Sequence, residues 1–165
     1  MKKLLLVLTL LFTAFCTYAQ DFSALQKVEY KEKTEYKAYE SQILESANYI
    51  LSVPVDDNNP NRQAALKALV TWMSGTPDYK FMVDETAAKL MHKNDAVLGI
   101  YFAAMTKYVL ENSDKASDNN EIKLNAVTLL LDYCEVKSNK MKLNKELKKA
   151  IAAKNGGKLK EYLNI

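Results

Sequence analysis

The chain has 165 residues, a formal net charge of +3, 26% charged residues and 48% hydrophobic residues. These values exclude a disordered polyelectrolyte and fit one folded domain of ordinary size. Only four glycines, two cysteines and one histidine are present, which argues against glycine-rich phosphate loops and against clustered zinc ligands.

Residues 1–19 have the pattern of a secretory signal peptide. Lys2 and Lys3 precede an apolar run at residues 4–15, and the sequence Thr-Tyr-Ala that closes the segment suits signal peptidase. We therefore expect export to the periplasm or beyond, with cleavage before Gln20.

The two cysteines bear on where the signal ends. Cys16 offers an alternative end as the acylated residue of a lipoprotein, but Phe15 stands where such a signal has a small residue. Cleavage before Gln20 removes Cys16 and leaves Cys134 as the only thiol, so no intramolecular disulfide is expected. We interpret Cys134 as a core residue, because it shares an apolar helix face.

Residues 20–165 are predicted to form a single all-α domain of about five to six helices, arranged as stacked helical hairpins or an irregular bundle. Apolar residues at helical spacing predict a first helix that begins near Glu35 and ends before Pro54. Residues 20–34 precede it and form either a loosely docked arm or the beginning of a long first helix.

The next two helices have recognisable start and stop signals. Asn59 is expected to cap the second helix and Pro60 to occupy its first turn. Gly75 is expected to end it in the left-handed conformation. Asp84 is predicted to cap a short third helix, and His92 lies in its last turn, where a basic residue complements the helix dipole.

Residues 94–111 predict a central helix, because apolar side chains cover nearly all of its surface. Its uncharged part, residues 96–106, is well below the ~20 residues that span a bilayer. Other helices must therefore pack around it, and no membrane-spanning segment is expected once the signal is removed.

Two further helices complete the chain. Asn119 or Asn120 is expected to cap the fifth helix, which carries Cys134. The sixth is predicted to begin near Asn144 and to stop at residues 155–157, with a short final turn after it.

The segments TWMSGTPDYKF, YFAAMTKYVLEN and KLNAVTLLLDYCE together resemble small exported helical proteins of bacteria that form an uncharacterised family. The resemblance covers most of residues 20–165. It implies one compact domain behind a signal peptide, and it implies no activity and no site residues.

The basic C-terminal helical segment, residues 137–165, contains nine lysines and two glutamates, whereas residues 20–136 carry a net charge of −6. We expect this segment to contact an envelope protein or another anionic envelope component. The alternative is a solvated helix face that is drawn to the acidic body of the same molecule. Nucleic-acid binding is not expected, because Tyr162 is the only aromatic residue in the segment and no arginine occurs there. The lysines predicted to make the contact are Lys140, Lys142, Lys145, Lys148 and Lys149.

Four aromatic residues are candidates for a ligand-binding pocket between helices, since amphipathic rings suit sugars and apolar ligands. They are Trp72, Tyr79, Tyr101 and Tyr108. The alternative is that all four belong to the hydrophobic core.

No catalytic residue, metal ligand or cofactor is predicted. The leading hypothesis is an exported, non-catalytic binding module of the bacterial envelope. The alternative is a carrier of a small lipid, sugar or other apolar ligand in the aromatic-lined pocket. A third hypothesis is an acid/base hydrolase that uses carboxylates such as Asp84 and Glu85.

Overall fold

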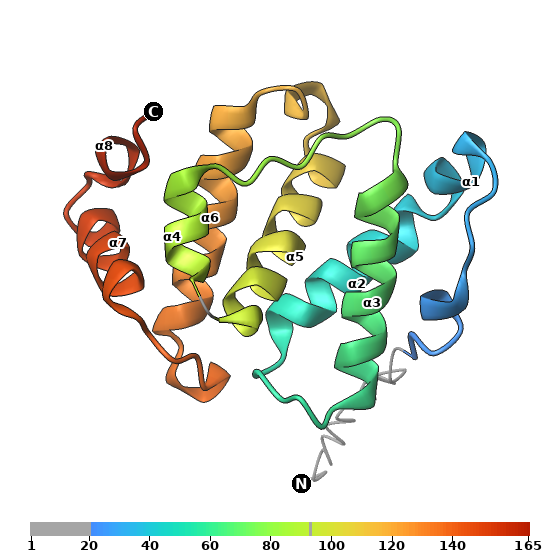
Figure 1. Cartoon of the computed structure of the whole chain (residues 1–165), viewed down its shortest axis with the longest axis horizontal. Helices are drawn as coiled ribbons and strands as arrows, with labels where there is room; N and C mark the ends of the chain where they lie inside the picture. The colour runs from blue at the N-terminus through green and yellow to red at the C-terminus, as the bar shows by residue number, and fades with distance from the viewer. Residues whose placement is uncertain (1–20, 93) are drawn as a thin grey trace, which may run out of the picture.

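The computed structural model describes residues 21–92 and 94–165 (Figure 1), and within them the chain forms helices and loops without a β-strand. The predicted all-α class is therefore confirmed. The signal peptide predicted at residues 1–19 lies outside the described residues. The helices are α1 (Lys33–Ala38), α2 (Glu40–Ser52), α3 (Pro60–Gly75), α4 (Glu85–Met91), α5 (Asp95–Glu111), α6 (Asn119–Glu135), α7 (Lys145–Asn155) and α8 (Leu159–Leu163), with the 3₁₀ turns η1 (Leu25–Lys27), η2 (Ser113–Lys115) and η3 (Lys137–Asn139).

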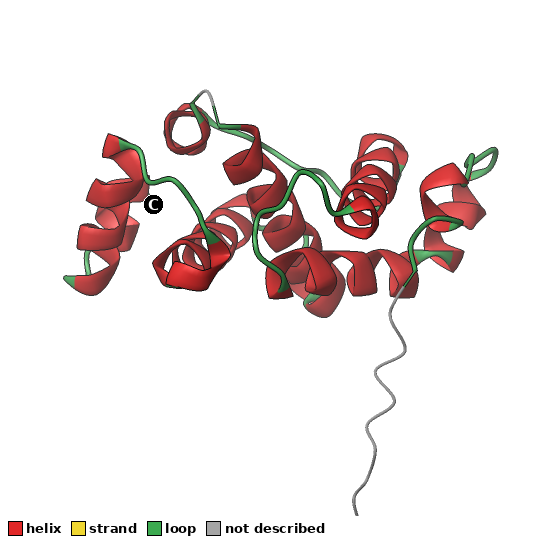
Figure 2. Ribbon diagram, turned by 90° about the horizontal axis from the view of Figure 1, so that it is seen from below, coloured by secondary structure: helices red, strands yellow, loops and turns green. Residues whose placement is uncertain are grey.

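Helix α5 lies at the centre and packs against α2, α3, α4 and α6. Helices α2 and α3 form one hairpin, and α5 and α6 form a second. Helices α7 and α8 pack on α6 at one end of the long axis, and α1 lies toward the other end (Figures 1 and 2). The predicted arrangement of stacked hairpins is thus the one observed.

The central position of α5 follows from its sequence. Asn94 caps it by accepting a 3.3 Å hydrogen bond from the Val97 N–H. Ten of its residues are buried, on every side of the helix. At Gly99 the partner helix α3 comes so close that an added Cβ would lie 3.3 Å from Leu66 Cδ2.

The local cap signals are mostly confirmed. Asn59 and Pro60 begin α3, and Asp84 begins α4 by accepting from the Ala87 N–H at 2.8 Å. The prediction for α6 was wrong by one residue, because Asp118 caps it instead of Asn119 or Asn120. A carboxylate is the stronger acceptor for first-turn N–H groups, and its charge complements the helix dipole.

The left-handed conformation predicted for Gly75 is wrong. Within the described part of the chain, positive φ values occur only at Lys140, Gly157 and Asn164. Gly75 is instead the last residue of α3, and an added Cβ would lie 2.0 Å from the Tyr36 hydroxyl oxygen. A side chain is excluded there by close packing of Tyr36 and not by backbone conformation.

The predicted first helix is broken at Tyr39 into α1 and α2. In a continuous helix the Tyr36 carbonyl would accept from the amide four residues later. Here it accepts from the Tyr39 N–H at 3.3 Å and from Trp72 Nε1 at 2.9 Å. The break, together with the short helix α8, raises the number of α-helices above the five to six predicted, to eight in the described residues.

The segment before α1 is an arm and not the beginning of a long helix. Phe22 is buried, and its N–H donates to Asn61 Oδ1 at 2.9 Å. Its ring lies 5.2 Å from that of Tyr49 on α2. The arm therefore joins the same hydrophobic core as the helices. None of the described helices is long and apolar enough to cross a membrane.

Candidate functional site

The four aromatic residues predicted to bind a ligand lie in the hydrophobic core. Trp72 is fully buried, Tyr101 is 1% exposed, and Tyr79 and Tyr108 are each 8% exposed. Trp72 uses its indole N–H to bond Tyr36 and lies 5.7 Å from the ring of Tyr79. Burial raises the pKa of Tyr101 far above its ordinary value. None of these four lines the cavities described below.

The five lysines predicted to contact an anionic partner are all exposed. Lys145, Lys148 and Lys149 lie on the outer face of α7, opposite the face that buries Leu147 and Ala150. Lys149 pairs with Glu146, one turn earlier, at 2.8 Å. The other four lysines form no ion pair with any described residue.

A different lysine of the same segment docks it onto the rest of the molecule. The Lys154 ammonium group pairs with Glu135 at 2.5 Å and with Asp132, both on α6. Although partial burial opposes its charge, the hydrogen bonds to these carboxylates raise the pKa of Lys154. The alternative interpretation, docking on the acidic body, therefore holds for Lys154, whereas the five lysines predicted to contact a partner are exposed.

Lys123 on α6 also connects the C-terminal helices to the rest of the molecule through polar contacts. Its side chain is 13% exposed and pairs with Asp84 at 2.8 Å. It also donates to the carbonyl of Leu163, in α8, at 2.7 Å. Asp84 is thus engaged in capping and in this ion pair, and Glu85 pairs with Lys89 at 2.9 Å.

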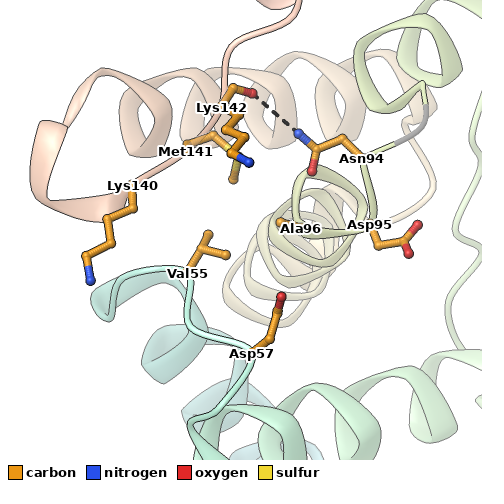
Figure 3. A pocket seen from close by; sticks show the side chains of 8 residues that line it. All are labelled: Val55, Asp57, Asn94, Asp95, Ala96, Lys140, Met141 and Lys142. Atoms are coloured by element: carbon orange, nitrogen blue, oxygen red, sulfur yellow. Dashed lines mark hydrogen bonds between the residues drawn. The ribbon is translucent and has the colours of Figure 1, made fainter.

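The beginning of α5 borders a cleft of about 550 Å³. Two connections complete its walls: the loop between α2 and α3, and the loop between α6 and α7 (Figure 3). Two of the predicted lysines belong to it. The residues that line it are Val55, Asp57, Asn94, Asp95, Ala96, Lys140, Met141 and Lys142.

Hydrogen bonds hold the two loops together beside α5. The Val55 N–H donates to the Asn139 carbonyl at 3.1 Å. The buried Asn139 side chain donates to the Tyr133 carbonyl at 3.0 Å, which fixes the loop to the end of α6. Asn94 Nδ2 donates to the Lys142 carbonyl at 3.3 Å (Figure 3), so the cap of α5 also holds the opposite wall.

The cleft has charges of both signs. The carboxylate of Asp57 and the ammonium group of Lys142 approach it from opposite sides (Figure 3). Lys140 borders the same cleft, but its ammonium group points away from Asp57 and Lys142 in this view, as does the carboxylate of Asp95. None of these four charged side chains forms an ion pair with another residue that the structure describes.

Cys134 and His92 differ in their surroundings, since Cys134 is buried and His92 is exposed. Burial raises the pKa of the Cys134 thiol to about 12, which suppresses the reactive thiolate. His92 follows the last residue of α4 and borders a shallow hollow of about 460 Å³ with Glu85, Lys89 and Glu146. In the described parts of the chain, no three His, Cys, Asp or Glu side chains are grouped so that they could hold a metal ion.

The sequence predicted Lys140 and Lys142 as contacts of an anionic partner, and it predicted neither the cleft nor the part of Asp57 and Asn94 in it. Asp57 belongs to no predicted helix or site, and Asn94 was expected only to begin the central helix. Their joint position depends on loops more than 35 residues apart along the chain. The available signal was the concentration of polar residues in each connection, which does not say which connections meet.

These features define an all-α protein of stacked helical hairpins with a charged cleft at the beginning of its central helix. No protein-family model, curated protein or solved structure matches the chain.

Proposed function

We propose that the chain is an exported, non-catalytic binding protein of the bacterial envelope that takes an anionic polymer as its partner. The observation that carries this proposal is the exposure of five lysines within residues 140–149, here called the lysine segment. They are Lys140, Lys142, Lys145, Lys148 and Lys149.

The distribution of ion pairs supports this function. Lys123 and Lys154 are largely covered and are neutralised by carboxylates of the same molecule. In the lysine segment only Lys149 forms an ion pair with a described residue, so most of the positive charge of the segment faces solvent. Exposed ammonium groups attract a polyanion over several ångströms, and salt screens this attraction.

The export proposal rests on the signal-like pattern at residues 1–19. The carrier hypothesis stays a prediction. Because Trp72 and the three tyrosines are packed in the core, the lysine segment is the better-supported binding surface.

The test measures retention on immobilised polyphosphate and elution by salt. Replacing Lys145, Lys148 and Lys149 together by Gln is expected to weaken binding about 100-fold, because each lysine near an anionic surface contributes roughly a factor of five.

A matched control removes the same charge elsewhere. Lys67, Lys80 and Lys115 are also exposed, and their combined replacement by Gln is expected to change binding by less than about threefold. Equal losses in the two triple variants would show that only net charge matters, and would contradict a binding surface on the lysine segment.

A further inference from the structure

We propose that the cleft at the beginning of α5 binds a short peptide that carries both a free ammonium group and a free carboxylate. The structure places Asp57 and Lys142 on opposite sides of one cavity, with apolar side chains between them. This ligand goes beyond the proposed function, because a small zwitterion occupies a cavity, whereas a polymer occupies an exposed surface.

The volume of the cleft indicates a ligand the size of a short peptide. A volume of about 550 Å³ lies within the roughly 300–1,000 Å³ of small-molecule sites and exceeds what a single amino acid fills. Val55, Ala96 and Met141 supply apolar contacts within it. Such a lining suits a chain of two or three residues with small side chains.

The charged side chains of the cleft indicate that the ligand has a charged group at each end. Asp57, Lys140 and Lys142 border one cavity and yet form no ion pairs with each other or with other described residues. All three side chains are exposed in the free protein, and a ligand that covers them displaces the water that screens their charges. A ligand with an ammonium group near Asp57 and a carboxylate near Lys142 pairs with both charges at once.

Ligands with a single charge are disfavoured by the same arrangement. A simple anion attracted by Lys142 also meets the carboxylate of Asp57. A simple cation attracted by Asp57 meets the ammonium group of Lys142. The cleft therefore distinguishes a zwitterion from either of its blocked forms.

The experiment titrates the purified protein with trialanine by isothermal calorimetry. The expected dissociation constant is about 0.1–1 mM, as for other ligands of this size. N-acetyl-trialanine and trialanine amide each lack one charge and are expected to bind about tenfold more weakly. Equal affinity of all three peptides, or no binding of trialanine at about 10 mM, would overturn the proposal.

Two substitutions test which side chain binds the ammonium group of the peptide and which binds its carboxylate. Asp57→Asn is expected to remove the preference for the free ammonium group, and Lys142→Gln to reduce the preference for the free carboxylate. Both variants are expected to fold, because the hydrogen bonds made by these residues use their backbone carbonyls, which accept from Gln63 and Asn94. The matched control is Asp114→Asn, which removes an exposed carboxylate in η2 that does not line the cleft. This variant is expected to bind trialanine like the parent protein.

The two proposals fail separately. Asp57→Asn is expected to leave retention on polyphosphate intact, whereas the triple substitution on α7 is expected to leave trialanine binding intact. Loss of peptide discrimination in the α7 triple variant, with no effect of Asp57→Asn, would place the peptide on the lysine segment and would contradict a zwitterion site in the cleft.

Discussion

Arg62 brings a positive charge into the interior, where it is 4% exposed. Its Nε and Nη2 atoms are buried and have no hydrogen-bond partner among the described residues. The guanidinium group lies beside Tyr133, whose pKa is raised by burial and partly lowered again by Arg62. Burial of the Arg62 guanidinium group therefore lowers the stability of the fold, because its contacts compensate only part of the cost of removing the charge from water.

Arg62→Met is therefore expected to raise the free energy of unfolding by about 1–2 kcal/mol. Methionine fills a similar volume without the charge, and the Tyr133 hydroxyl keeps its 2.7 Å hydrogen bond to the Val53 carbonyl. Urea unfolding followed by circular dichroism measures the change. Arg62→Ala is the control and is expected to lower stability, because it leaves a cavity. A loss of stability in Arg62→Met as large as in Arg62→Ala would contradict this account.

Gly75→Ala is expected to destabilise the protein by about 1–3 kcal/mol, because the new methyl group collides with the Tyr36 ring and hydroxyl. Tyr36→Phe removes the nearest atom, so Gly75→Ala is expected to be milder in that background. Thermal unfolding of the four proteins in the double-mutant cycle measures the coupling. Ser74→Ala, at the preceding exposed helical position, is expected to change the melting temperature little, and purely additive effects in the cycle would rule out the collision.

At the scale of elements, Lys154 connects α7 to α6 with 19% of its side chain exposed. Lys154→Gln is expected to lower the free energy of unfolding by about 1 kcal/mol, since it leaves Asp132 and Glu135 side by side without a counter-charge. Hydrogen exchange is expected to accelerate in α7 and α8 and to stay unchanged in α5. Lys148→Gln on the outer face of α7 is the matched control, and uniform acceleration throughout the molecule would contradict a local docking role.

The sequence was informative at most helix starts, where the capping side chain acts on its own helix. Four caps could each be predicted from the residues around them, because the side-chain acceptor reaches the amide three residues later; they are Asn59, Asp84, Asn94 and Asn144. The break at Tyr39 could not, because the Trp72 indole N–H that captures the Tyr36 carbonyl comes from a residue 36 positions along the chain.

The same limit applies to the candidate site. Exposure of the lysines on α7 follows from the helical period of Leu147 and Ala150. The cleft does not follow, because it arises where two connections meet the beginning of α5 and are joined by one backbone hydrogen bond from Val55 to Asn139. Long-range contacts of that kind have no periodic signature in the sequence.

At the scale of the whole molecule, several weak acids are held in their neutral forms. Burial raises the pKa of Tyr30, Tyr162 and Cys134 to about 12, and that of Tyr101 further still. In the unfolded chain these groups ionise near their ordinary values, 10.0 for tyrosine and 9.0 for cysteine. An acid whose pKa is higher in the folded state stabilises the fold below its unfolded pKa, and this contribution is lost as pH rises toward the folded value.

The free energy of unfolding is therefore expected to be level near pH 8, to decline from about pH 9, and to keep declining toward pH 12. Urea unfolding at pH 8, 9, 10 and 11 measures this profile. Tyr101→Phe is the informative variant, because the Tyr101 hydroxyl has no hydrogen-bond partner within the described residues. Its removal is expected to make the decline shallower without lowering stability at pH 8. A steepness unchanged by Tyr101→Phe would show that burial of this hydroxyl does not contribute to the alkaline instability.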